Sequence, residues 1–165
     1  MKTYQDLIFE KINEEDINIL TPIMKRAFDE DTHIHLGKEC GGPPGYDNGD
    51  FLRQFALHND STSYKICTNG KVVGAIILWI NNSTNRNFLG TVFIDKEVEN
   101  KGIGKKVWEF VELEFPNTEI WKTETPIFSR RNHNFYVNKC GFHIVKIENP
   151  KDSEEGSFIL EKRMK

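Results

Sequence analysis

Apolar residues follow two periods along the chain, and the change from one period to the other separates strands from helices. Alternation of apolar and polar residues, or short apolar runs, predicts seven strands over residues 7–12, 64–68, 71–80, 88–94, 119–124, 142–147 and 157–162. Spacings of three and four predict helices that follow Asn13 and that cover 51–59, 103–115 and 129–139. The pattern predicts an α/β chain.

Residues that break regular structure divide these elements. Asn69-Gly70 predicts a two-residue hairpin turn, and Gly90 inside an apolar run predicts a β-bulge. Pro22 weakens the middle of the first helix, which either kinks there or begins later. Residues 29–50 are polar and rich in glycine and proline, so we expect a surface loop that serves as a variable substrate lid.

Length and composition indicate one globular domain over residues 1–165. The chain has 38% hydrophobic and 28% charged residues, enough apolar material for a core at this length. The net charge of −3 gives no reason to expect a nucleic-acid partner.

The cysteines and the first residues bear on the compartment. Cys40, Cys67 and Cys140 are odd in number and widely spaced, so a disulfide framework is not expected. The N-terminal residues lack the apolar region of a secretion signal, and the longest apolar run, 72–80, is too short to cross a bilayer. We therefore expect a cytoplasmic protein without a membrane partner.

Residues 92–108 predict a strand, a basic glycine turn and a helix. Gly102 and Gly104 allow a tight turn with exposed N–H groups, where the first amides of the helix lack intrahelical partners. Together with Lys101, Lys105 and Lys106, this helix N-terminus favours a phosphate or pyrophosphate. The alternative is a glycine-capped helix with a solvated lysine face.

Two common phosphate-binding motifs do not fit this turn. A Walker loop needs a glycine at position 99 and a serine or threonine at 106, where the chain has Glu99 and Lys106. A dinucleotide fingerprint needs a third glycine at position 107, which is Val107.

Residues 99–104, Glu-Asn-Lys-Gly-Ile-Gly, resemble motif A of the GNAT superfamily of acetyl-CoA-dependent N-acetyltransferases. Glu99 replaces the usual glutamine or arginine and Lys96 a common proline; we expect the Glu99 side chain to point outward, away from a pyrophosphate. The resemblance implies acetyl-CoA as the acetyl donor, bound by Ile94, Lys96, Asn100, Lys101, Gly102, Ile103, Gly104 and Lys105.

A second stretch, residues 134–142, resembles motif B of the same superfamily, in which a helix with a tyrosine ends in Gly-Phe. Tyr136 stands five residues before Gly141, one more than usual, so the helix either holds an extra residue or presents the tyrosine differently. The order of predicted elements is also similar to the GNAT fold. This implies a single GNAT-like domain: a mixed, mostly antiparallel sheet of six to seven strands with about four helices.

The resemblance implies direct acetyl transfer to a primary amine through a tetrahedral intermediate. The attacking amine must lose a proton, and the leaving thiolate needs an acid. Tyr136 is the predicted acid, and Glu124, which ends a strand, is the predicted base, with a merely solvated carboxylate as the alternative. A backbone N–H near Ile94 would stabilise the oxyanion. Asp95 is a second base candidate, although a structural role suits it better.

Other features leave alternatives open. The acidic residues of 29–50 either attract a cationic amine or are simply solvated. His33, His35, Cys40 and Asp31 lack a second ligand pair at zinc spacing, so no metal is expected. Arg130, Arg131 and His133 either line the cofactor or begin a helix. A non-catalytic acyl-CoA-binding or sensor module is the alternative function. The sequence leaves open whether the acceptor is a small amine or a peptide, and whether the protein forms a homodimer.

Overall fold

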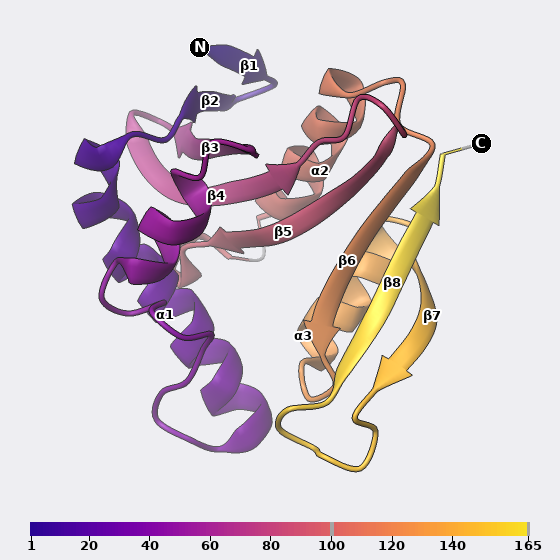
Figure 1. The fold of residues 1–165 in the computed structure, drawn as a ribbon. Helices are drawn as coiled ribbons and strands as arrows, with labels where there is room; N and C mark the ends of the chain where they lie inside the picture. The colour runs from indigo at the N-terminus through magenta and orange to yellow at the C-terminus, as the bar shows by residue number, and fades with distance from the viewer. Residues whose placement is uncertain (100, 165) are drawn as a thin grey trace.

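The computed structural model describes residues 1–99 and 101–164, and its centre is one eight-stranded sheet (Figure 1). The strand order is β1-β2-β3-β4-β5-β6-β8-β7, and neighbours are antiparallel except for the parallel pair β5 and β6. The strands are β1 (Lys2–Tyr4), β2 (Leu7–Lys11), β3 (Ser61–Thr68), β4 (Lys71–Trp79), β5 (Arg86–Ile94), β6 (Ile120–Pro126), β7 (His143–Glu148) and β8 (Ser157–Arg163).

Helices lie between the strands in the predicted order. They are η1 (Glu14–Asp16), α1 (Ile17–Leu36), η2 (Leu52–Ala56), η3 (Lys96–Val98), α2 (Ile103–Glu114), α3 (Arg130–His133) and η4 (Asn134–Lys139). The predicted mixed α/β architecture is confirmed, with one strand more than expected. The additional strand, β1, has three residues, which is too short to show a period.

Each face of the sheet carries its own apolar core. Ile103, Val107, Phe110 and Trp121 belong to the cluster on the α2 face, and Leu20, Met24 and Phe93 belong to the cluster on the α1 face. Successive residues of β4 alternate between the two: Ile76 and Leu78 join the α2 core, whereas Ala75 and Ile77 join the α1 core. The buried run of this strand is therefore explained by helices on both sides.

Helix α1 corrects the predicted loop over residues 29–50, because it continues to Leu36 with Pro22 inside it. Asp31 and Thr32 are buried on its inner face, and pairs four residues apart, such as Lys25 with Asp29, stabilise its second half. Gly37, at φ 68°, ends it by donating its N–H to the His33 carbonyl. Only residues 37–50 remain for a loop.

Strands β5 and β6 separate toward their carboxyl ends and leave a wedge in the sheet (Figure 1). They pair only between residues 86–88 and 120–122. One residue further, the Thr123 hydroxyl donates to the Leu89 carbonyl at 2.9 Å. Beyond this bond, β8 is the one strand of the described residues that pairs with β6, so the outer edge of β5 is open to them.

Gly90 forms the predicted bulge beside the wedge. Thr91 pairs with Ile77 and Leu89 pairs with Leu78, so Gly90 has no partner residue on β4. A Cβ atom at Gly90 would lie 2.8 Å from Nε1 of Trp79, which explains why glycine is required. The bulge redirects the last part of β5 toward the wedge.

An ion pair fixes α1 to the end of β5. Arg26 Nη2 lies 2.7 Å from Asp95 Oδ2, and Arg26 Nε donates to Asp95 Oδ1 at 3.2 Å. Asp95 also accepts a hydrogen bond from the Glu97 amide, and its side chain is 2% exposed, whereas that of Arg26 is 38% exposed. These contacts support a structural role for Asp95.

The two partners of this pair should not contribute equally to stability. We expect Arg26→Met to cost about 3 kcal/mol, because it leaves a buried carboxylate without its counter-ion. Asp95→Asn should cost about 1 kcal/mol, because it keeps the shape and leaves an arginine that water can solvate. Urea unfolding at pH 7 measures both values, and equal costs would contradict this explanation.

Acid provides a further check on the pair. The hydrogen bonds from Arg26 hold the pKa of Asp95 below its usual value. The stabilisation is therefore complete above the unfolded-state pKa of about 3.9 and is lost as the pH falls through the lower, folded-state pKa. We expect the difference in free energy of unfolding between the wild type and Arg26→Met to become smaller as the pH falls through that range.

Candidate functional site

A cavity of about 240 Å³ lies at the open edge of β5. The elements around it are β5, the end of the turn before α2, the first turn of α2, α3, η4 and the second half of α1. Its lining includes Ala27, Phe28, Asp31, Val92, Phe93, Ile94, Val98, Glu99, Gly102, Ile103, Gly104, Lys105, Arg131, Asn132, Asn134, Phe135, Tyr136 and Lys139.

The start of α2 gives this cavity an anion seat. Gly102 is the N-cap at φ 75°, and the amides of residues 103–105 have no acceptor within the helix. A Cβ atom at Gly104 would lie 2.9 Å from Cε1 of Phe135, so glycine lets η4 pack closely over the turn. Lys105 and Lys139 line the same cavity. These residues fit a phosphate group.

The structure brings together most, but not all, of the residues predicted to bind the cofactor. Ile94, Gly102, Ile103, Gly104 and Lys105 line the cavity. Lys96 and Lys101 are exposed and lie off it, and Lys106 instead pairs with Asp6 at 2.9 Å. Asn100 lies outside the described residues.

Backbone amides of β5 face the wedge. The Asp95 amide donates to the Val73 carbonyl at 2.7 Å, toward β4. Because amide directions alternate along a strand, the N–H groups of Ile94 and Val92 point the other way. Within residues 1–99 and 101–164, no strand pairs with β5 on that side beyond Phe88. Donors of this kind suit an oxyanion.

Tyr136 reaches the point where β5 and β6 separate. It lies in η4, a π-helix in which the Cys140 amide donates to the Phe135 carbonyl five residues earlier. The wider turn holds the extra residue between Tyr136 and Gly141. The tyrosine is buried with its hydroxyl near Thr123, and burial raises its pKa well above the usual value. It therefore stays protonated at neutral pH.

Glu124 does not line the cavity that Tyr136 lines. It is exposed on β6, it lies between the buried Thr123 and Thr125, and strand alternation points it to the opposite face of the sheet. Its carboxylate accepts a hydrogen bond from Ser157 at 2.7 Å. The cavity lining does not include it.

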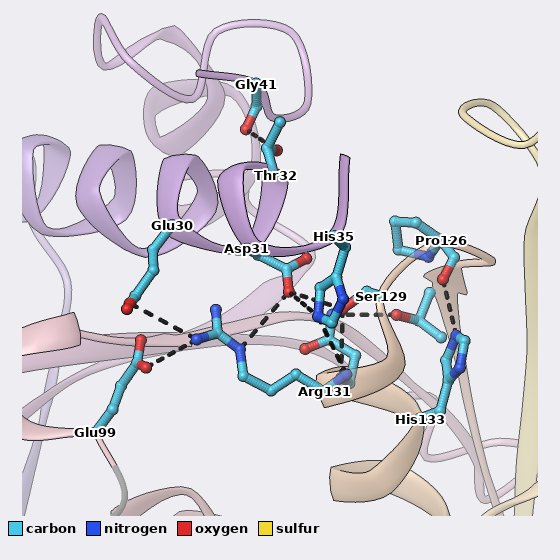
Figure 2. Close-up of polar contacts among 12 residues, drawn as sticks. Glu30, Asp31, Thr32, His35, Gly41, Glu99, Pro126, Ser129, Arg131 and His133 are labelled. Atoms are coloured by element: carbon cyan, nitrogen blue, oxygen red, sulfur yellow. Dashed lines mark hydrogen bonds and ion pairs between the residues drawn. The ribbon is translucent and has the colours of Figure 1, made fainter. Parts of the chain in front are cut away.

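Glu99 instead points into the cavity, which corrects the expectation that it points outward. Figure 2 shows the Arg131 guanidinium reaching from α3 toward three carboxylates. Arg131 Nη1 lies 2.8 Å from Glu99 Oε2 and 3.6 Å from Glu30 Oε2, and Arg131 Nε lies 3.6 Å from Asp31 Oδ1. The sequence signal for this network was the glutamate at position 99, where the motif usually has glutamine or arginine. A negative side chain at this position can pair with Arg131.

Burial and neighbouring charges tune this network. Burial raises the pKa of Glu99 to about 7; Arg131 opposes the rise and Glu30 adds to it. His35 lies 3.4 Å from Asp31, and burial lowers its pKa. Ser129 is fully buried and donates to Asp31 at 2.9 Å. Near neutral pH the network carries more negative than positive charge.

The sequence model of the acetyltransferase (GNAT) family matches residues 24–142, which include most of α1, the glycine turn and η4. The chain belongs to the GNAT acetyltransferase family. This GNAT chain is also 37% identical over 151 residues to "Uncharacterized protein YrkN" from Bacillus subtilis (strain 168), across 90% of this chain and 80% of that protein.

Solved structures share the fold of this GNAT domain at low identity. The PaiA N-acetyltransferase of Thermoplasma acidophilum, in complex with coenzyme A, has a TM-score of 0.72 and 18% identity, over 95% of this chain and 98% of its own. The spermidine N-acetyltransferase of Vibrio cholerae, in complex with CoA and spermine, has a TM-score of 0.70 and 10% identity, over 96% of this chain and 96% of its own. The ribosomal-protein-S18-alanine N-acetyltransferase of Escherichia coli has a TM-score of 0.72 and 15% identity, over 96% of this chain and 94% of its own.

Three further observations concern the described part of this GNAT domain. No helix there is long and apolar enough to cross a membrane. No group of three or more histidine, cysteine, aspartate or glutamate side chains in that part could hold a metal ion. The three cysteines are free.

Proposed function

We propose that this GNAT domain binds acetyl-CoA at the N-terminus of α2 and transfers the acetyl group directly to a primary amine. One observation carries the proposal: a single cavity is lined by the anion seat, by Val92 and Ile94 of β5, and by Tyr136. A phosphate site, amide donors and a protonated tyrosine are the parts that acyl transfer from a phosphate-containing thioester needs.

Each part has a role in this reaction. Acetyl-CoA, when bound, supplies an acetyl group activated as a thioester. The first amides of α2 and Lys105 hold phosphate, which places the ligand. The N–H of Ile94 lies on the open edge of β5, where it stabilises negative charge on the carbonyl oxygen. Tyr136 donates its proton to the leaving sulfur.

The acceptor is an amine, and two kinds fit the family. The names of the relatives above include a spermidine acetyltransferase and an acetyltransferase for an alanine of a ribosomal protein. The first acceptor is a small polyamine and the second belongs to a protein. The excess of carboxylates at Glu30, Asp31 and Glu99 suits a cationic acceptor of either kind.

A non-catalytic acyl-CoA-binding module is the second candidate. Glu99 favours it, because it replaces the motif's usual glutamine or arginine beside the anion seat. The inward position of Tyr136 favours the enzyme, because a binding module has no need of a buried acid next to the wedge.

Calorimetric titration with CoA and an assay of thiol release separate the possibilities. We expect CoA to bind and acetyl-CoA to release thiol in the presence of propylamine, spermidine or an alanine-initiated peptide. Binding of CoA without release by any amine would establish the non-catalytic module instead. A wild-type protein that does not bind CoA would overturn both.

A further inference from the structure

The network around Arg131 contains a buried acceptor without a donor. Glu30 Oε2 is shielded from solvent and has no hydrogen-bond partner within the described residues, because Arg131 Nη1 stays 3.6 Å away. An unpaired buried oxygen is costly. The carboxylates of Glu30 and Glu99 face the same guanidinium nitrogen, because Arg131 Nη1 lies 3.6 Å from Glu30 Oε2 and 2.8 Å from Glu99 Oε2. Two carboxylates are both acceptors, so a hydrogen bond between them requires a proton on one of them.

We propose that Glu99, held between Glu30 of α1 and Arg131 of α3, takes the proton from the amine that is acetylated. This proposal rests on the proposed function and gives it a base that lines the cavity, whereas Glu124 does not. Glu99 shares the cavity with Tyr136 and with the open edge of β5.

The proton balance of the step follows from these positions. The ammonium first loses one proton to solvent, and Glu99 takes a second proton from the nitrogen as the neutral amine attacks. A nitrogen–carbon bond forms at the acetyl carbon and gives a tetrahedral oxyanion; the carbon–sulfur bond then breaks, and the sulfur leaves with the electron pair. Tyr136 donates a proton to that sulfur. Glu99 then carries a proton whose hydrogen bond to Glu30 Oε2 stabilises the protonated state. Before the next turnover solvent removes this proton and returns one to Tyr136.

The surrounding charges poise Glu99 for this role. Glu30, Asp31 and His35 face the network from α1, Arg131 reaches it from α3, and the cavity is also lined by Lys105 and Lys139. Near neutral pH both forms of Glu99 are populated. A base of this strength accepts a proton from an amine better than an ordinary exposed carboxylate with a pKa of about 4.3.

The pH dependence of kcat/KM tests the proposal, with acetyl-CoA and whichever of propylamine, spermidine or the peptide gives the fastest release. For the wild type we expect an acid limb with an apparent pKa of about 7, a value that belongs to the Glu30–Glu99 pair. Glu99→Gln should remove this limb and lower the rate at pH 8 by about 100-fold.

Two neighbouring substitutions should shift the limb in opposite directions. Glu30→Gln removes the negative charge that favours the protonated form, so the limb moves to lower pH. Arg131→Gln removes the cation that favours the charged form, so the limb moves to higher pH. The matched control is Glu39, which is exposed, lies three residues beyond the end of α1 and is off the cavity. Glu39→Gln should change neither the acid limb nor the rate.

A measurement without turnover accompanies the kinetics. In protein labelled with ¹³C at glutamate carboxyls, one resonance should titrate near pH 7 and should be absent from Glu99→Gln. In Glu30→Gln the titration midpoint of this resonance should shift to lower pH. If Arg131→Gln does not fold, the two glutamate variants still decide the question.

Results that overturn this inference differ from those that overturn the proposed function. Acetyl transfer by Glu99→Gln with the wild-type pH profile, or loss of the acid limb in Glu124→Gln, rejects Glu99 as the base but leaves the transferase intact. Failure to bind CoA rejects the transferase itself.

Discussion

Gly104→Glu is expected to weaken CoA binding by about 1000-fold or more. The new side chain would begin 2.9 Å from Phe135 and place a carboxylate where the amides of residues 103–105 face the cavity. Each hydrogen bond between an amide and a charged phosphate contributes about 1.5–3 kcal/mol. Losing two of them costs about 4 kcal/mol, which corresponds to the expected loss of affinity. Isothermal titration with CoA measures it.

Matched substitutions distinguish damage to the anion seat from damage to the fold. Gly104→Ala adds only a methyl group against Phe135 and should weaken binding by less than Gly104→Glu. Leu113→Glu places the same charge on an exposed position of α2, off the cavity, and should leave CoA affinity unchanged. Unaltered binding by Gly104→Glu would mean that CoA does not occupy this turn.

Tyr136→Phe is expected to lower kcat by about 100-fold, which is within the range for loss of a general acid. Phenylalanine fills the same buried space between Phe135 and Phe142, so the fold should be kept. CoA affinity should change little, because the hydroxyl lies beside Thr123 and not at the anion seat. Steady-state thiol release gives kcat, and titration of the variant with CoA gives the affinity.

A second tyrosine provides the control for this experiment. Tyr64 packs edge-on against Phe9 and Phe110 in the same apolar core, away from the cavity. Tyr64→Phe should therefore keep the wild-type kcat. An unchanged kcat in Tyr136→Phe would remove the acid role from Tyr136.

Features set by neighbouring residues could be predicted from the sequence. The Asn69-Gly70 hairpin depends on two residues that tolerate positive φ, and both adopt it in the structure. The bulge at Gly90 and the turn at Gly102 also follow from local backbone chemistry. For this reason the strand, glycine turn and helix that form the anion seat could be identified before the fold was known.

Features set by distant contacts could not be predicted. The second half of α1 has weak helix formers, and it is helical because Asp31 and Thr32 are buried against other elements. The partner of Glu99 lies 32 residues away on α3, so the motif alone suggested an outward side chain. The face on which Glu124 lies depends on strand register, which the chemistry of a glutamate does not reveal.

The separate cores on the two faces of the sheet have a practical consequence for spectroscopy. Trp108 and Trp121 belong to the α2 core, whereas Trp79 packs against the α1 core. Variants that retain only Trp79 or only the other two would therefore report on opposite faces by intrinsic fluorescence. Such a pair of reporters can reveal whether the two layers melt in one cooperative transition or in sequence.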